Sequence, residues 1–250
     1  MILRACALAL FTLVALLPLD AQTSPSSGPS FGFPTLSRTD SLADRRRALV
    51  DQLASTFSIS QHLGDALSTI PRERFLPDYL RNLAYEDSSL PLGSGQALPS
   101  PSDLVRIAQA LGLGPADSLL LYGRDTGYAA ALFSRLVSAV FVIDLDPGET
   151  KRDTQIYASL GITNITSSAG TSEVSFAKNA PFTKILVHGA VAEIPPALLG
   201  QLAPGGRLVA PLADPSGFQM LVMVHNTSPT LTIQSVGKCF FPTIRSGAGT

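Results

Sequence analysis

The segment from residue 118 to residue 144 constrains the fold of this 250-residue chain more than any other. It combines a short apolar strand, a turn bracketed by Gly123 and Gly127, an alanine-rich helix and a second apolar strand. Uninterrupted apolar strands are typical of a parallel sheet that is covered on both faces. Asp144 ends the second strand about 20 residues after the turn, where nucleotide-binding α/β folds place a carboxylate for ribose hydroxyls. Spacing alone leaves two interpretations open, a bare βαβ unit and a nucleotide site.

The N-terminal region predicts a leader and a linker before a folded domain. Residues 1–21 combine Arg4 with an apolar run that is short for a membrane span, and Ala21 offers a cleavage point. These features predict a signal peptide, with an uncleaved N-terminal membrane anchor as the alternative. Residues 22–40 are rich in Ser, Pro and Gly, which is typical of a flexible linker. We therefore expect an exported protein, periplasmic or secreted, whose domain spans residues 41–250.

Composition excludes several kinds of partner. The chain has 18 Lys and Arg against 19 Asp and Glu, so no basic excess favours nucleic acid. Its two cysteines, Cys6 and Cys239, exclude a disulfide framework and a cysteine zinc site. His62, His188 and His225 have no ligand-like spacing, and we expect no metal. We also expect a monomer with no membrane contact beyond the N-terminal segment.

The rest of the sequence predicts an α/β fold in which strands alternate with helices after an N-terminal helical extension. Helices are expected over residues 41–57, 61–70, 103–111, 128–136, 154–160 and 195–202. Further strands are expected over residues 164–168, 184–188 and 207–212, with an antiparallel hairpin over 218–225 and 231–239. Ser102 is the expected cap of the helix that follows it. Residues 85–102 are expected to form a long loop, and such loops are usually functional.

Several short motifs follow one another in an order that is too specific for accidental likeness. They occupy residues 70–77 (IPRERFLP), 84–87, 90–96, 127–128, 180–182, 193–199, 202–209 and 240–242. Together they resemble the protein-L-isoaspartate O-methyltransferase family, over about residues 48–247. The resemblance implies a Rossmann-like methyltransferase fold, mostly parallel with helices on both faces, and S-adenosylmethionine as cofactor. It also implies isoaspartyl-containing proteins or peptides as substrates, methyl-esterified at L-isoaspartyl residues of damaged proteins.

The resemblance assigns a cofactor site, and this chain departs from the family pattern at several of its positions. Asp125 stands where the family has the middle glycine of its turn, which adds a Cβ and a carboxylate where the cofactor approaches. Thr171 stands where the family has an aspartate that faces the adenine, and Leu121 replaces an acid. The implied cofactor-binding positions are Gly123, Asp125, Gly127, Tyr128, Asp144, Gly170 and Thr171.

The implied substrate loop also departs from the family pattern. The family's Gly-Gln-Thr-Ile-Ser corresponds here to Gly95, Gln96, Ala97, Leu98 and Pro99, so both hydroxyls are missing. One place later, Ser100 is the candidate catalytic residue that would replace them. The family reaction transfers a methyl group from a sulfonium to a carboxylate that is already ionised. Such chemistry needs positioning and electrostatics more than a strong base.

These departures leave more than one function open. In the first interpretation the chain is an active S-adenosylmethionine-dependent enzyme, with Arg124 pairing with the cofactor's carboxylate and Asp144 holding its ribose. In the second it is an exported, catalytically degenerate family member that acts as a binding or structural protein. Such a protein would bind altered peptides through loop 85–102. A small-molecule methyltransferase is less favoured, because the loop framework resembles the peptide-binding family. Fold alone does not decide between them.

Overall fold

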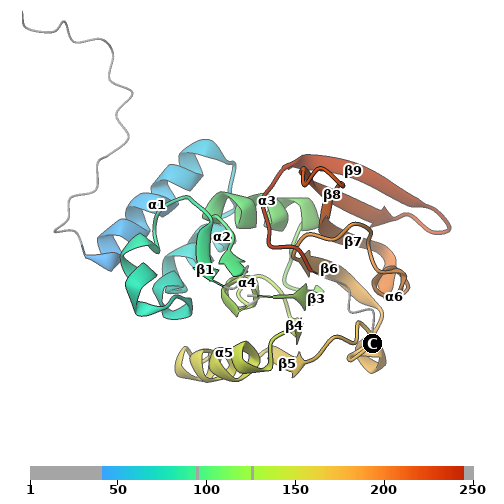
Figure 1. The fold of residues 1–250 in the computed structure, drawn as a ribbon, viewed down its shortest axis with the longest axis horizontal. Helices are drawn as coiled ribbons and strands as arrows, with labels where there is room; N and C mark the ends of the chain where they lie inside the picture. The colour runs from blue at the N-terminus through green and yellow to red at the C-terminus, as the bar shows by residue number, and fades with distance from the viewer. Residues whose placement is uncertain (1–40, 94–95, 125–126, 245–250) are drawn as a thin grey trace, which may run out of the picture. The chain divides into compact units, whose positions relative to one another are not determined.

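The structure, a computed structural model, describes residues 41–93, 96–124 and 127–244. These residues form a seven-stranded mixed sheet with helices on both faces, together with a separate two-stranded hairpin (Figure 1). The expected α/β architecture, with its N-terminal helical extension and antiparallel C-terminal strands, is therefore confirmed. The expected signal peptide and linker lie outside the described residues, and the proposed domain boundaries stay a prediction.

An N-terminal layer of helices precedes the sheet. Its elements are α1 (Leu42–Thr56), α2 (Gln61–Thr69) and the 3-10 turns η1 (Arg72–Phe75) and η2 (Asp78–Leu83). Ser41 and Ser60 cap the two helices by accepting the amides of Asp44 and Leu63, as short polar residues do at helix starts. Leu49 and Leu53 of α1 are buried in one cluster with Leu63 and Leu67 of α2, and the helices expected over residues 41–57 and 61–70 are both present.

The described residues between 85 and 102 contain regular structure where a loop was expected. They contain the antiparallel strands β1 (Leu90–Gly93) and β2 (Gln96–Leu98). The helix α3 (Pro101–Leu111) then begins after Ser100, which accepts the amide of Asp103. The expectation that Ser102 is the cap is wrong, because Pro101 takes the first helical turn. Ser102 instead donates its hydroxyl and its amide to the Asp87 carboxylate.

The sheet reverses its strand order beside β3. Its spatial order is β5-β4-β3-β6-β7-β8-β9, with parallel pairing from β5 to β7 and antiparallel pairing from β7 to β9. The strands are β3 (Ser118–Gly123), β4 (Ala139–Asp144), β5 (Ile165–Ala169), β6 (Phe182–His188), β7 (Leu202–Ala213), β8 (Gln219–Asn226) and β9 (Leu231–Lys238). The chain adds β4 and β5 on one side of β3, then crosses to β6 on the other. Ligands of open α/β folds bind at the carboxyl ends of strands at such a switch point.

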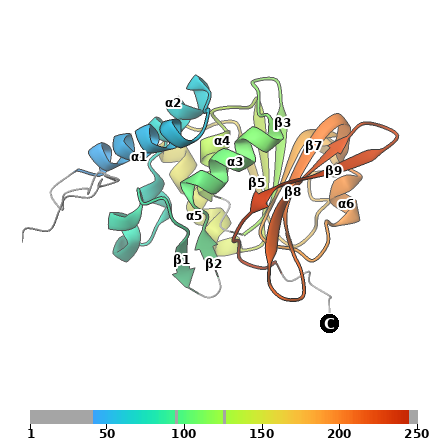
Figure 2. The ribbon, with the colours of Figure 1, turned by 90° about the horizontal axis from the view of Figure 1, so that it is seen from above.

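Alternate residues of β3 face opposite layers, which explains why this strand is apolar throughout. Leu119 and Leu121 join the cluster that includes the N-terminal layer, whereas Leu120 and Tyr122 join a second cluster on the other face. The first face carries α3, α4 (Gly127–Phe133) and α5 (Pro147–Ser159). The second carries the short α6 (Pro196–Leu199) and η3 (Ala177–Asn179), as Figure 2 shows for α6.

Several element boundaries differ from the sequence expectations. The helix expected over residues 154–160 begins at Pro147, because Asp146 accepts the amides of Gly148 and Glu149 and so caps it early. Strand β7 begins at Leu202 rather than residue 207, since Leu202 pairs with Phe182 ahead of a register shift. The helices expected over residues 128–136 and 195–202 are both shorter, ending at Phe133 and Leu199.

Candidate functional site

Predicted site residues meet at the carboxyl edge of the sheet. Gly123, at the end of β3, is in register with Asp144 on one side and with His188 on the other. Asp144 is in turn in register with Ala169, and its carbonyl accepts the amide of Gly170 at 2.9 Å. The structure therefore brings the predicted positions Gly123, Asp144 and Gly170 together at the switch point.

Asp144 is a buried carboxylate at this edge. The residue is 1% exposed, and its Oδ1 accepts the amide of Asp146 at 2.8 Å. The next residue, Leu145, donates its amide to the Gly123 carbonyl at 2.9 Å. The turn after β4 is thus tied both to the carboxylate and to β3. A fixed carboxylate at this place is chemically suited to accept hydrogen bonds from two hydroxyls of a ribose.

Gly123 and Gly127 are required by packing within the protein. A Cβ at Gly123, whose φ is +156°, would collide with the backbone carbonyl of His188. A Cβ at Gly127 would collide with the carboxylate of Asp153. The family resemblance assigned both glycines to the cofactor site, and that role stays a prediction. The structure gives a different reason for both, because the spaces beside them are filled by β6 and α5.

Asp153 is a buried carboxylate that the sequence analysis missed. It is 3% exposed and packs against Gly127, with Arg152 at 3.5 Å. Burial raises the pKa of the Asp153 carboxyl to about 7, with Arg152 opposing the shift and Glu149 and Asp144 adding to it. The signal available in the sequence was its position on α5, three and four residues before the buried Ile156 and Tyr157.

The protonation of Asp153 predicts how stability depends on pH. Its folded-state pKa of about 7 exceeds the ordinary value of an unfolded aspartate, about 3.9. The folded state therefore holds this proton more tightly, and its contribution to stability is complete below pH ~4 and is lost as the pH rises through ~7. Asparagine has no such titration, so the free energy of unfolding of Asp153→Asn minus that of wild type should be larger at pH 8 than at pH 5. The expected increase is roughly 2–4 kcal/mol. Urea unfolding at the two pH values measures this, with the exposed Asp65→Asn as control. An unchanged pH slope would contradict it.

Tyr128, a predicted cofactor residue, directs its side chain into the protein core. The residue is 2% exposed, and its ring centroid lies 5.7 Å from that of Phe75. The guanidinium of Arg72 lies 5.9 Å from the same ring, and burial raises the pKa of the Tyr128 hydroxyl to about 12. The side chain of Tyr128 therefore joins α4 to the N-terminal layer. Its role toward a cofactor stays a prediction.

Arg72 is fully buried and organises the segment between η2 and α3. Its guanidinium donates to the backbone carbonyls of Ala84 (2.7 Å), Glu86 (3.2 Å), Ser88 (3.3 Å) and Pro99 (2.8 Å). Burial lowers its pKa to about 10, so the group remains a cation at neutral pH. One side chain thus ties both ends of the predicted substrate loop to the N-terminal layer. Sequence reasoning missed it, because the motif around it contains a second arginine, Arg74.

The predicted substrate residues that the structure describes lie in β2 and between β2 and α3. Gln96 and Ala97 lie on β2, and the carbonyl of Pro99 is bound by Arg72. The Ser100 hydroxyl donates to Asp103 Oδ2 at 2.8 Å and accepts the amide of the same residue at 3.1 Å. Ser100 is therefore a helix cap, and its predicted catalytic role is untested. The predicted positions Gly95 and Asp125 lie outside the described residues.

The segment after β5 borders a cavity at the same edge of the sheet. Gly170 has a φ of +143° and open space where a Cβ would lie, and Thr171 beside it is exposed. Glu173 follows, and its carboxylate accepts the Tyr122 hydroxyl at 3.3 Å. Tyr122 and Glu173 line a cavity of about 620 Å³ that also reaches Val191 and Ile244. This cavity lies beside the end of β3, and none of the predicted cofactor-binding positions that the structure describes lines it.

Comparison with known proteins decides the family. The model of the family described as "Protein-L-isoaspartate(D-aspartate) O-methyltransferase (PCMT)" matches residues 44–249. This chain belongs to that family. A protein-L-isoaspartate O-methyltransferase 2 of Anaeromyxobacter sp. is 37% identical over 197 residues, covering 79% of this chain and 81% of that protein. A protein-L-isoaspartate O-methyltransferase of Koribacter versatilis is 37% identical over 199 residues, covering 79% of this chain and 89% of that protein.

Solved structures of protein-L-isoaspartate O-methyltransferases share the fold. One has a TM-score of 0.73 and 26% identity, over 80% of this chain and 66% of that chain. A Plasmodium falciparum protein assigned to the same activity, solved with S-adenosyl-L-homocysteine, has a TM-score of 0.70 and 14% identity, over 81% of this chain and 99% of that one. At that identity the second likeness concerns the fold alone.

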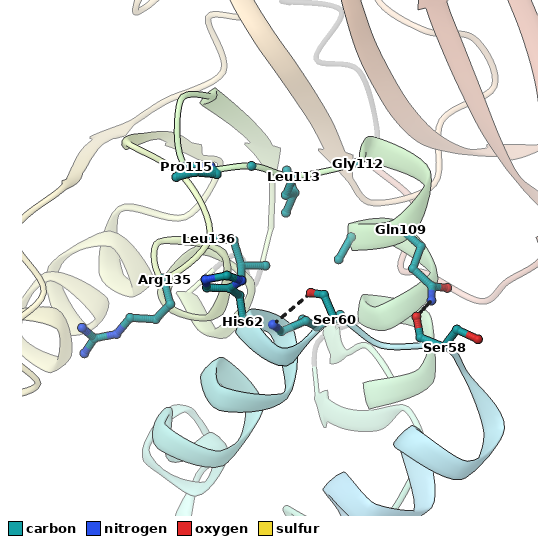
Figure 3. A pocket seen from close by; sticks show the side chains of 12 residues that line it. Ser58, Ser60, His62, Gln109, Gly112, Leu113, Pro115, Arg135 and Leu136 are labelled. Carbon is teal, nitrogen blue, oxygen red and sulfur yellow. Dashed lines mark hydrogen bonds between the residues drawn. The ribbon is translucent and has the colours of Figure 1, made fainter.

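A second cavity of this PCMT-family chain lies at the opposite edge of the sheet. It has a volume of about 350 Å³ and is bordered by residues 112–115 and 135–136, which precede β3 and β4 (Figure 3). His62 of α2 and Ser60, which caps that helix, line the cavity from the N-terminal layer. The Ser60 hydroxyl already accepts a hydrogen bond from the amide of Leu63. This cavity is separate from the carboxyl edge.

The described part of this PCMT-family chain contains neither a cluster of metal-ligating side chains nor a membrane-spanning helix. Within residues 41–93, 96–124 and 127–244, no group of three or more His, Cys, Asp or Glu side chains is placed to hold a metal ion. The helices of these same segments are all too short or too polar to cross a lipid bilayer.

Proposed function

We propose that this protein is an S-adenosylmethionine-dependent methyltransferase that esterifies L-isoaspartyl residues of damaged proteins and peptides. One observation carries the proposal: a single family match runs through residues 44–249. It therefore includes the N-terminal layer and the hairpin held by Arg72 as well as the nucleotide-type sheet. Relatives that bear the name of this activity are 37% identical over 197 and 199 residues. A likeness confined to the sheet would support only the fold.

The residues of the carboxyl edge fit the cofactor. Asp144 would supply a buried carboxylate for the ribose hydroxyls, and the backbone at Gly170, where nothing lies within 4 Å of the position of a Cβ, would lie beside the adenine. Arg124, at the start of the turn after β3, would pair with the cofactor's carboxylate. When bound, S-adenosylmethionine supplies a methyl group that is activated by its attachment to a positively charged sulfur. Family membership and the donor chemistry of these residues support this assignment.

The remaining task of the chain is to position the substrate. An isoaspartyl carboxylate is ionised at neutral pH, so no side chain has to remove a proton from it. What the protein contributes is orientation and a site from which water is excluded. The hairpin β1–β2 is the segment suited to this role, because Arg72 fixes the backbone on both sides of it. Ser100 contributes by capping α3, which sets the direction in which the loop ends.

The degenerate-scaffold interpretation receives no support from the comparisons. It rests on sequence departures such as Asp125, which lies outside the described residues, and Thr171. A direct test is the affinity for S-adenosylmethionine, measured by calorimetry on the wild type and on Asp125→Gly. Tight binding by the wild type supports the enzyme. Absence of binding by the wild type together with its recovery in Asp125→Gly would restore the degenerate interpretation.

Asp144 provides a prediction within the same titration. Asp144→Asn keeps an oxygen that can accept the amide of Asp146 but removes the charge offered to the ribose. We expect S-adenosylmethionine to bind more weakly by ~1–3 kcal/mol, the usual loss for a hydrogen bond to a charged group. Asp65→Asn, an exposed change on α2, serves as the control and should leave affinity unchanged. Equal affinity of Asp144→Asn and wild type would show that the ribose binds elsewhere.

We further propose that the protein is exported and works as a monomer. Arg4 followed by a short apolar run and by Ala21 supports removal of residues 1–21 by signal peptidase. Intact-mass measurement of protein recovered outside the cytoplasm should give an N-terminus near Gln22. Recovery of the full-length chain in membranes would instead support the uncleaved anchor. Size-exclusion chromatography with light scattering tests the monomer.

A further inference from the structure

His188 ends β6 and is bonded to the turn that follows β3. Its Nδ1 lies 2.6 Å from the carbonyl oxygen of Arg124, and the amide of Arg124 donates to the His188 carbonyl at 3.2 Å. A carbonyl oxygen can only accept a hydrogen bond, so the proton must reside on Nδ1. The two residues therefore exchange a reciprocal pair of hydrogen bonds. This pair lies directly beside Gly123, which leaves no space for a Cβ against the same backbone.

The imidazole is held as a neutral group. His188 is 2% exposed, and burial lowers its pKa to about 4. Its Nε2 is buried and has no hydrogen-bond partner among the described residues. An unprotonated Nε2 is consistent with this environment, because it leaves an acceptor rather than a charge without a partner. The neutral tautomer with the proton on Nδ1 is thus the form that the site selects.

The other side of the ring contacts the C-terminal segment. Phe241 packs edge to face against His188, with ring centroids 5.7 Å apart and planes at 86°. The backbone of Phe241 is fixed in both directions by Gln219, at 2.7 Å and 2.9 Å. Beyond it, Ala190 and the residues around Pro242 and Ile244 exchange backbone hydrogen bonds of 2.8 Å. His188 therefore lies between a rigid C-terminal segment and the turn after β3.

We propose that His188 is a positioning residue for the cofactor turn, acting through the carbonyl of Arg124. Its Nδ1–H fixes the orientation of that carbonyl and with it the direction in which the chain leaves β3 toward Gly127. The inference rests on the proposed function in naming S-adenosylmethionine as the ligand of this turn. The end of β3 is also held from the side of β4, because Leu145 donates its amide to the Gly123 carbonyl at 2.9 Å. The reciprocal pair with His188 holds it from the side of β6.

Two variants separate the hydrogen bond from the packing of the ring. His188→Phe keeps an aromatic ring against Phe241 but removes the donor, leaving the Arg124 carbonyl unpaired. His188→Asn removes the ring but retains an amide nitrogen close to the position of Nδ1. We expect S-adenosylmethionine affinity to fall about tenfold in His188→Phe, the equivalent of one modest hydrogen bond, and less than threefold in His188→Asn. Thermal unfolding of each variant confirms that both are folded at the temperature of titration.

Two measurements on the free protein make the test independent of the cofactor. Hydrogen exchange at the Arg124 amide should be faster in His188→Phe and close to wild type in His188→Asn. Nitrogen NMR of the wild-type imidazole should place the proton on Nδ1. A proton on Nε2, or equal exchange and equal affinity in both variants and wild type, would overturn the inference. Equal loss of affinity in both variants would also overturn it, by assigning the effect to the ring. A wild type that binds no S-adenosylmethionine would instead refute the proposed function, and exchange at Arg124 would then decide the inference alone.

Discussion

Arg72→Met is expected to destabilise the protein by at least ~3 kcal/mol, because it removes a charged donor from four carbonyls, of which those of Ala84 and Pro99 are buried, while leaving the carbonyls in place. The guanidinium is completely buried and donates to the carbonyls of Ala84, Glu86, Ser88 and Pro99. Methionine fills a similar volume, so the lost hydrogen bonds dominate the change. Urea unfolding measures the free energy of unfolding for the variant and for wild type.

The control for this variant is Arg81→Met. Arg81 forms an exposed ion pair with Asp78 at 3.0 Å, and such pairs contribute about 0–1 kcal/mol. Arg72→Lys should still lose much of the stability, since an ammonium cannot replace a planar fork that donates in several fixed directions. A change of less than 1 kcal/mol in Arg72→Met would show that the carbonyls find other partners, and that Arg72 does not hold the loop.

Gly123→Ala is expected to lose at least ~3 kcal/mol of stability and to abolish cofactor binding. The added Cβ would collide with the carbonyl of His188, which is backbone and has no rotamer with which to move aside. The φ of +156° adds conformational strain for any residue other than glycine. Relief requires β3 and β6 to separate at their ends, where we propose the cofactor site. The measurement is urea unfolding together with S-adenosylmethionine titration.

Gly161→Ala isolates the steric part of this effect. Gly161 also has a positive φ, +64°, but nothing lies within 4 Å of the position of its Cβ. Its replacement should cost only about 1 kcal/mol, the usual penalty for a left-handed backbone conformation. Similar losses for Gly123→Ala and Gly161→Ala would mean that the contact with His188 yields easily, and would contradict the packing argument.

The sheet could be predicted because its physical signals are local. The apolar runs of β3, β4 and β6 predict strands that are covered on both faces, and the structure has a strand at each of these three places. Asp144 could be predicted from its position at the end of such a run. The hairpin β1–β2 could not, because both strands are short and β1 contains Pro and Gly, which weaken the alternating pattern of a strand.

Buried charges were the main omission of the sequence analysis. Arg72 is buried because carbonyls from residues 84–99 converge on it, and that convergence is a property of the fold. The burial of Asp153 is also a property of the fold, since its carboxylate occupies the space left by the missing side chain of Gly127. The cap of α3 was a choice between two serines. Ser100 and Ser102 are both suitable caps, and Pro101 favours Ser100 because proline is preferred at the first position of a helix.

The central claim is most directly tested by methyl transfer from S-adenosylmethionine to a peptide that contains a single L-isoaspartyl residue. The matched substrate is the same peptide with an ordinary aspartyl residue, and the matched enzyme is Asp144→Asn. We predict a base-labile methyl ester on the isoaspartyl peptide, none on the aspartyl peptide, and slower formation with the variant at limiting cofactor. No ester on the isoaspartyl peptide at a cofactor concentration that calorimetry shows to be saturating, or equal methylation of both peptides, would contradict the account.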